Sequence, residues 1–186
     1  MRTVLIVCGI LQLWIALKLS YNEAVMFKMT NAVCKSYNES WVVIHKCRVR
    51  AISRNKTTFN FNATFLHPAY KIHYRAELFQ KANGYKPWLV NATVDACRFL
   101  KRPFHPFAIL LGKLFLEFSN FNHTCPYNAS ILIQNLIDGF YLKWTALPHT
   151  LPTGEYLLGM TWILDGSPTF ITNVYFMFTE DLAPKY

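Results

Sequence analysis

The sequence predicts an all-β protein, an antiparallel β-sandwich with one short helix. Three observations lead to this fold class. Apolar and polar residues alternate in most segments, as they do in strands with one buried face. Turn-forming residues separate these segments at short intervals, and after the first 20 residues only one stretch is apolar at nearly every position. With 186 residues, of which 53% are hydrophobic, the chain can bury one core of ordinary size.

Residues 1–20 are predicted to be a signal peptide. Arg2 supplies a positive charge, and residues 4–17 form an apolar run with a single polar side chain. This run is shorter than the ~20 residues that a membrane-spanning helix needs. An uncleaved membrane anchor is the alternative. Cleavage after Ser20 competes with cleavage near Ala24, and no transmembrane segment is expected to remain afterwards.

The cysteine count changes with that cleavage. One cysteine leaves with the signal peptide, and the remaining four are the even number expected of two disulfides in a secreted chain. Cys34 and Cys47 flank a turn-like Asn-Glu-Ser segment, and Cys97 and Cys125 flank the apolar stretch. Of the three connectivities that four cysteines allow, Cys34–Cys47 with Cys97–Cys125 is therefore the first choice.

Asn-x-Ser/Thr sequons are more frequent than chance allows. Six occur, whereas the Asn, Ser and Thr content would give about 1.5. This excess predicts a glycoprotein that passes through the secretory pathway. The sequons are at Asn38, Asn55, Asn62, Asn91, Asn122 and Asn128.

Period-two alternation predicts six strands within a single domain over residues 21–186. The segments are 41–51, 57–65, 70–78, 88–94, 156–164 and 170–178, with a weaker candidate at 141–146. The alternation is clearest at 57–65, where phenylalanine and alanine alternate with Thr and Asn. Asp165-Gly166 predicts a hairpin turn between the last two segments, which Ser167-Pro168 is expected to widen beyond two residues.

Residues 107–118 depart from this pattern. They are apolar except at positions that include Lys113 and Glu117, which lie four residues apart and so share one helical stripe. Pro103 and Pro106 precede them, and proline is favoured at the entrance of a helix. A short helix is predicted near 107–118, and a strand buried in the core is the alternative.

The sequence carries no recognisable catalytic motif. It has ten carboxylates, scattered singly, and lacks a Gly-x-Ser-x-Gly elbow, a phosphate-binding glycine loop and a His-Glu-x-x-His pair. The six histidines show no metal-ligand spacing, and no Cys-x-x-Cys occurs. We therefore expect a protein that is not an enzyme and that needs no metal or other cofactor.

Positive charge gathers in the first part of the chain. Residues 21–113 hold 15 basic and 4 acidic side chains, whereas residues 114–186 hold 2 and 6. The densest basic run comprises Lys46, Arg48, Arg50, Arg54 and Lys56. Attraction to anionic lipid head groups or acidic glycans is one interpretation, and a solvated edge strand that its charges protect from aggregation is the other. Nucleic acid is not an expected partner of a secreted chain.

Aromatic residues are abundant, at 16% of the chain. Seven lie on inward strand phases: Phe59, Phe61, Phe65, Trp88, Trp162, Phe170 and Phe176. Such bulky residues on two splayed sheets can line an apolar cavity for a hydrophobic small molecule or lipid. The alternative, which the sequence by itself favours, is that the rings fill the core.

Five blocks of the chain match a known pattern. They are Phe27–Cys34, Asn83–Leu89, Asp95–Leu100, Ser119–Tyr127 and Leu151–Tyr156. Together they resemble a large family of secreted insect proteins of unknown function, with Glu155 where that family has Asp. The family is similar to the fly chemosensory CheB proteins. Through them it resembles the ML lipid-recognition superfamily, which includes the ganglioside activator and the Niemann-Pick sterol carrier.

This resemblance implies an immunoglobulin-like (ML-like) β-sandwich that holds a ligand between its sheets. It implies a secreted protein that binds a hydrophobic small molecule or lipid in chemosensory or pheromone signalling. An extracellular accessory protein that binds a protein partner through its surface, with no internal ligand, is the alternative. A hydrolase on the same scaffold is a third hypothesis. The resemblance carries over no catalytic or binding residues.

Overall fold

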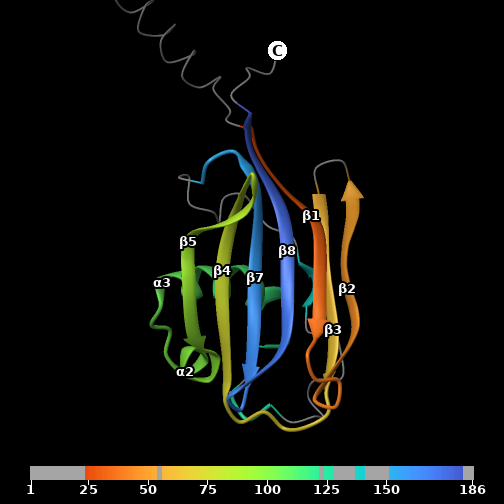
Figure 1. Cartoon of the computed structure of the whole chain (residues 1–186), viewed down its shortest axis with the longest axis vertical. Coiled ribbons are helices and arrows are strands. Elements are labelled where there is room, and N and C mark those ends of the chain that lie inside the picture. Colours follow the sequence, from red (N-terminus) through yellow and green to blue (C-terminus); the bar gives the residue numbers. More distant parts are fainter. Residues whose placement is uncertain (1–23, 54–55, 122–123, 128–136, 141–150, 182–186) are drawn as a thin grey trace, which may run out of the picture.

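Two antiparallel sheets form the molecule, as the sequence predicts (Figure 1). The computed structural model describes residues 24–53, 56–121, 124–127, 137–140 and 151–181. The signal peptide expected at 1–20 and the weaker strand expected at 141–146 lie outside these residues.

The strands differ in length but all pair antiparallel. They are β1 (Ala24–Ser36), β2 (Val42–Ser53), β3 (Lys56–Phe65), β4 (Ile72–Ala82), β5 (Gly84–Asp95), β6 (Ile137–Phe140), β7 (Gly154–Leu164) and β8 (Ser167–Asp181). The larger sheet has the order β1-β8-β7-β4-β5 and the smaller one the order β2-β3-β6. The helices are α2 (Ala96–Lys101), α3 (Pro106–Phe115) and the 3-10 helix η1 (Leu116–Phe118). The predicted sandwich with a short helix near 107–118 is therefore confirmed.

The last two strands meet in a tight turn. Asp165 and Gly166 have φ angles of 46° and 90°, a left-handed conformation that Asp tolerates and Gly adopts freely. The Asp165 carboxylate also accepts a hydrogen bond from the Lys71 backbone N–H at 2.8 Å. Because these two residues complete the turn, Ser167-Pro168 does not widen it. The expectation of a longer turn was wrong: β8 begins at Ser167, which pairs with Leu164.

The smaller sheet is joined to the larger one by a disulfide. Cys34 of β1 and Cys47 of β2 are bonded, with their Cα atoms 6.0 Å apart. β1 pairs with β8, whereas β2 pairs with β3, so these cysteines connect strands of different sheets. The disulfide therefore fixes the edge at which the two layers meet.

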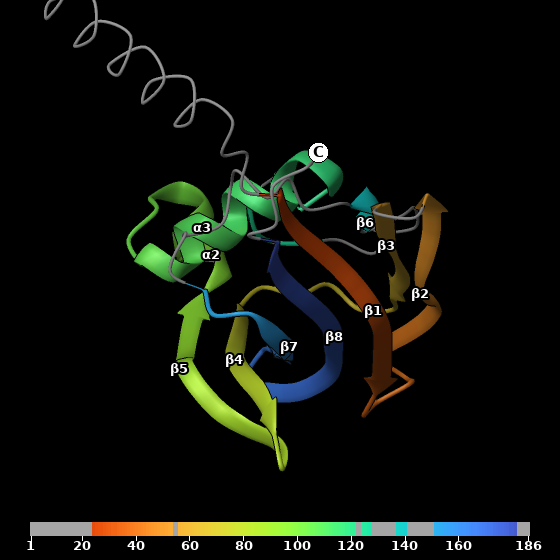
Figure 2. The same ribbon diagram turned by 90° about the horizontal axis from the view of Figure 1, so that it is seen from above.

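The helices lie beside the smaller sheet, over the concave face of the curved larger sheet (Figure 2). Asp95 caps α2, because its carboxylate accepts a hydrogen bond from the Arg98 backbone N–H at 2.9 Å. α3 begins with Pro106. The first backbone N–H groups of a helix have no acceptor within the helix, so proline, which lacks an N–H, is well tolerated there. The second layer of the sandwich is thus part sheet and part helix.

The core consists of two neighbouring clusters. In the first, which we call the sheet half, side chains of β3 that include Phe59, Phe61 and Phe65 pack against Phe170 of β8. In the second, the helix half, buried side chains of α2 and α3 pack with those of β4, β5 and β7; its members include Phe99, Ala108, Leu111, Tyr74, Leu158 and Met160.

Candidate functional site

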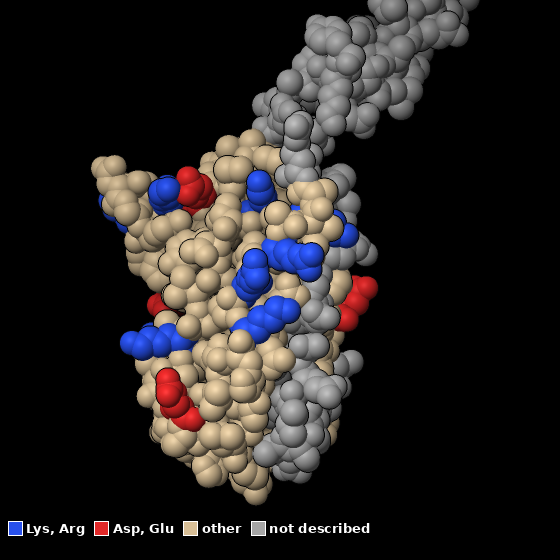
Figure 3. Space-filling view, turned by 90° about the vertical axis from the view of Figure 1, so that its right-hand side faces the viewer, with Lys and Arg blue, Asp and Glu red and all other residues tan. Residues whose placement is uncertain are grey.

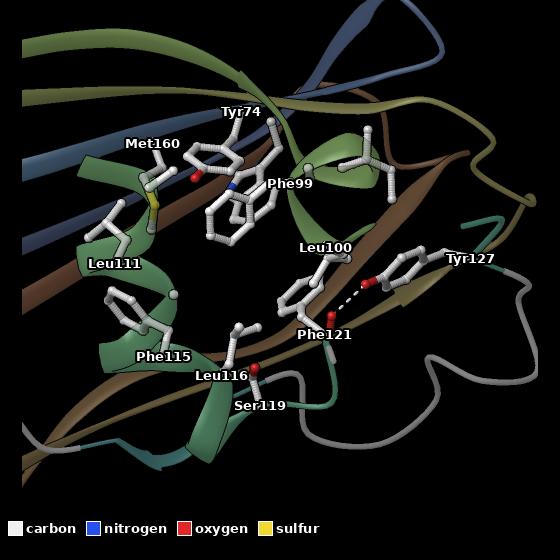
Figure 4. Close-up of a pocket in the computed structure, with 15 residues that line it drawn as sticks. Tyr74, Phe99, Leu100, Leu111, Phe115, Leu116, Ser119, Phe121, Tyr127 and Met160 are labelled. Carbon is white, nitrogen blue, oxygen red and sulfur yellow. Dashed lines mark hydrogen bonds between the residues drawn. The ribbon is translucent and has the colours of Figure 1, made fainter. Parts of the chain in front are cut away.

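Two apolar cavities lie beside α3 in the helix half. Cavity 1 has a volume of about 100 Å³ and lies between α2, α3 and η1 on one side and β4 and β7 on the other (Figure 4). Its lining includes Tyr74, Phe99, Leu111, Phe115, Ser119 and Met160. Most of this lining is hydrocarbon, and the exceptions are hydroxyl and sulfur groups and the indole N–H of Trp162, which donates to the Thr172 hydroxyl at 3.1 Å.

Cavity 2 is larger, with a volume of about 230 Å³. Side chains of β1, β5, β7, β8 and α3 line it, and every lining residue is apolar; among them are Phe27, Trp88, Leu110, Leu114, Leu158 and Phe176. Concave, apolar pockets of this kind are typical of sites for hydrophobic small molecules.

The two cavities have a common wall. Leu111 and Phe115 of α3 are the two side chains that line both. They lie four residues apart, so they project from the same face of the helix, toward the sheet. Leu111 is 8% exposed, whereas Phe115 is half-buried and stacks on Phe140 with ring centroids 4.3 Å apart. α3 therefore decides how much space remains on either side of it.

Three of the seven aromatic residues proposed as pocket lining do line a cavity. Trp162 lines cavity 1, and Trp88 and Phe176 line cavity 2. The other four, Phe59, Phe61, Phe65 and Phe170, lie in the sheet half and are at most 2% exposed. The sequence placed this space between the two sheets. Cavity 1 lies instead between the larger sheet and the helices, and cavity 2 lies between the larger sheet and α3, with Phe140 of the smaller sheet as one lining residue.

The hydroxyl groups of cavity 1 differ in their hydrogen bonding. The Tyr127 hydroxyl donates to the Phe121 carbonyl at 2.7 Å (Figure 4). No hydrogen bond joins the Tyr74 hydroxyl to another described residue, and burial raises the pKa of Tyr74 to about 12. The Ser119 Oγ is buried and likewise has no hydrogen-bond partner among the residues that the structure describes.

A second disulfide holds the segment that carries α3. Cys97 and Cys125 are bonded, with Cα atoms 5.6 Å apart and 28 positions apart in the sequence. Next to Cys125, the backbone of Tyr127 exchanges two hydrogen bonds with Ala69, of 2.9 and 3.0 Å. Both disulfides thus have the first-choice pairing. The Cys97–Cys125 bond ties α2 to the far end of cavity 1.

Sequence reasoning missed several lining residues of the helix half. Tyr74 lies on the inward phase of a predicted strand, so its position was visible in the alternation. Phe99 belongs to α2, which is only six residues long; Asp95 at its N-cap was the one local signal for it. Leu111 and Phe115 lie on the predicted helix, but no signal in the sequence indicates that this helix forms a cavity wall.

The described sequons lie at different depths. Asn38 and Asn91 are exposed, and Asn62 is half-buried. The Oδ1 of Asn38 accepts hydrogen bonds from the Ser40 backbone N–H at 3.1 Å and from the Ser40 Oγ at 2.6 Å. The sequons at 55, 122 and 128 lie outside the described residues, and glycosylation stays a prediction for all six.

Basic side chains follow the outer face of β2. Lys46, Arg48 and Arg50 are exposed, and their cross-strand neighbours on β3 are Asn62, Asn60 and Thr58. Figure 3 shows Lys and Arg side chains gathered in the middle of this side of the molecule, with Asp and Glu toward its margins. None of the ion pairs between described residues includes these three cations. We call them the basic stripe.

Searches for metal and membrane features return nothing in the described part of the chain. No group of three or more His, Cys, Asp or Glu side chains is placed there to hold a metal ion. No helix of that part has the length and apolar character needed to cross a bilayer.

The comparisons with known proteins identify one domain. No curated protein matches the sequence. Residues 74–158 match a family described as Protein of unknown function (DUF1091). This segment runs from β4 into β7 and includes both helices, the Cys97–Cys125 disulfide and the two hydroxyl groups of cavity 1 that lack partners. Residues 74–158 are thus similar to this family over the helices and over part of the lining of both cavities.

Proposed function

We propose that this protein binds a hydrophobic small molecule or lipid, with the apolar part of the ligand in cavity 2. The observation that carries the proposal is the size and lining of that cavity, about 230 Å³ lined by apolar side chains of described residues. Burial of apolar ligand surface against such a lining contributes about 25 cal/mol per Å² removed from water. This gain favours an apolar ligand over a polar one.

A route into cavity 2 supports the proposal. Leu89 of β5 lines the cavity and yet is 78% exposed. Its φ angle is 51°, a strained conformation for a residue other than glycine, and such strain is concentrated at functional sites. Half-buried Phe107 and Leu151 lie on the same cavity. We take this apolar rim as the entrance.

The setting that we propose is extracellular. The apolar leader at 1–20, the excess of sequons and the two disulfides support a secreted glycoprotein. The resemblance to the insect family, the CheB proteins and the ML superfamily supports ligand carriage in chemosensory or pheromone signalling. The ligand would then be an apolar compound exchanged outside the cell.

Native mass spectrometry of protein secreted from insect cells tests the proposal. A copurifying apolar compound that is lost on denaturation, together with saturable binding of the fluorescent probe N-phenylnaphthylamine, is the expected result. Leu110→Trp should abolish probe binding, because Leu110 lines cavity 2. Ile109→Trp is the matched control, since the neighbouring Ile109 lines neither cavity. Equal binding by both variants, or no binding by the wild type, would refute the proposal.

The basic stripe favours a second candidate function, binding of an anionic extracellular partner. Lys46, Arg48 and Arg50 repeat along an extended strand and have neutral cross-strand neighbours, so their charge is available to a partner. Replacing all three by Gln should lower retention on a sulfated-glycan column. The matched control replaces exposed Lys71, Arg75 and Lys86, which removes the same charge from other positions. Equal losses of retention would indicate net charge alone.

A further inference from the structure

Two hydroxyl groups in the lining of cavity 1, those of Tyr74 and Ser119, are placed where they could hydrogen-bond with a bound ligand. Figure 4 shows the hydroxyl end of Tyr74 directed toward Met160 and Leu111, while Ser119 lies at the opposite end of the cavity. Neither hydroxyl is hydrogen-bonded to another described residue, although both belong to an otherwise hydrophobic lining. The buried Ser119 Oγ lacks a partner, which is unfavourable, and the less deeply buried Tyr74 hydroxyl can also take one, so a bound oxygen atom would stabilise this arrangement.

The described lining of both cavities carries no charged side chain, and this limits the functional group to which the bound oxygen atom can belong. Among the residues that the structure describes, no Lys, Arg or His side chain lines cavity 1 or cavity 2. A carboxylate or phosphate buried there would lack a counter-charge, which is strongly unfavourable. The high pKa of Tyr74 has the same cause, since its surroundings disfavour a negative charge. A neutral oxygen, as in an alcohol, ketone or ester, meets no such penalty.

We infer that the ligand is a neutral amphiphile, whose apolar tail fills cavity 2 and whose single oxygen function enters cavity 1 to hydrogen-bond with Tyr74 or Ser119. The common wall makes this continuity possible. Leu111 and Phe115 separate the two spaces, and Phe115 is only half-buried, so a rotamer change of its ring opens a path between them. This inference rests on the proposed function.

Displacement of N-phenylnaphthylamine by decanol, decane and decanoate tests the inference on the full secreted chain. The three competitors have the same chain length and differ in the end group. Tyr74→Phe and Ser119→Ala each remove a hydroxyl and little else. At least one of them should weaken decanol about tenfold while leaving decane unchanged, because a neutral hydrogen bond is lost only with the alcohol. Decanoate should displace the probe less well than decanol at neutral pH.

Tyr175→Phe is the matched control, since Tyr175 lines neither cavity. It should leave all three competitors unchanged. Unaltered decanol binding in both Tyr74→Phe and Ser119→Ala would overturn the inference, as would decanoate binding more tightly than decanol. After either result, the proposed function would still be supported if the wild type binds the probe and Leu110→Trp abolishes that binding. Failure of the wild type to bind the probe would overturn both.

Discussion

The two halves of the core differ in how much space is left beside their side chains. In the sheet half, Phe61 and Phe170 are at most 2% exposed and stack with ring centroids 6.0 Å apart. In the helix half, Phe99 and Leu111 are 8% exposed, and cavities of about 100 and 230 Å³ remain beside α3. Both halves rest on the same concave sheet, so the difference comes from what covers it.

Geometry accounts for this difference. Two sheets pack with regular rows of side chains that interdigitate across about 10 Å. A helix is a cylinder about 10 Å wide that touches a curved sheet along one line, so space remains on both of its flanks. α3 has only ten residues, and the cavity beside it is lined by side chains of all five strands of the larger sheet. The rings of the sheet half therefore pack against one another, whereas space remains on the flanks of α3.

Truncating a phenylalanine in each half should give the largest contrast. Phe170→Ala is expected to lower the free energy of unfolding by about 3–5 kcal/mol, because Phe170 is fully buried among other rings. Phe115→Ala should cost clearly less, because part of its ring already faces cavities and has few contacts to lose. Urea denaturation of both variants measures the difference. Equal losses would mean that the two halves are packed alike.

The two disulfides also differ from each other, in the length of the chain segment that each closes into a loop. Chain entropy predicts a loss of about 3.5 kcal/mol when Cys97 and Cys125 are replaced by Ala, and about 3 kcal/mol for Cys34 and Cys47, because the separations are 28 and 13 residues. Hydrogen exchange should accelerate in α2 and α3 for the first pair and in β1 and β2 for the second. Loss of probe binding is expected only when Cys97 and Cys125 are replaced. Loss of probe binding only on replacement of Cys34 and Cys47 would contradict the difference drawn between the two halves.

How much the sequence could predict also differs between the halves. In the sheet half, Phe59, Phe61 and Phe65 alternate with polar residues, and period two is enough to place them inward. β1 escaped prediction because its register shifts between Met29 and Asn31, which interrupts the alternation of buried positions along the strand. The pattern is reliable where a strand is regular and fails at a bulge.

The candidate site was harder to predict than the strands. Alternation shows which side chains of a strand point inward, but it does not show which element packs against them. Trp162 and Phe170 are both inward residues, and their rings stack at 5.5 Å, yet only Trp162 lines a cavity. Strand order decides this, since it determines which part of the large sheet the small sheet covers. Strand order is a long-range property that alternation within a segment does not contain.

The response to high pH should distinguish a tyrosine of the helix half. Tyr74 has its pKa raised to about 12, so the folded protein keeps its proton where the unfolded chain loses it. Stability from this group is complete below about pH 10 and is lost as pH rises to about 12. The loss should reach about 2–3 kcal/mol. Tyr74→Phe should remove this part of the decline in chemical denaturation; a decline identical to that of the wild type would contradict the burial of Tyr74.

The smallest effect should come from Gly112, where α3 approaches α2. A Cβ at this position would lie 3.1 Å from the Phe99 ring, which is too close unless the ring moves. Because Phe99 lines cavity 1, it has room to shift, and replacing glycine within a helix contributes up to about 1 kcal/mol. Gly112→Ala should therefore be neutral or slightly stabilising while it reduces the volume of cavity 1.

Gly112→Ala adds one methyl group, which should weaken ligand binding without lowering the stability of the fold. Thermal unfolding should show an unchanged or higher midpoint, and decanol should bind more weakly in the displacement assay because the Phe99 ring occupies part of cavity 1. Gly159→Ala is a useful counterpart on β7, because its Cβ would meet Asn173 Oδ1 at 3.3 Å and Phe79 at 3.6 Å, neither of which lines cavity 1 or cavity 2. A large destabilisation by Gly112→Ala would mean that Phe99 cannot move and that the helix half is as tightly packed as the sheet half.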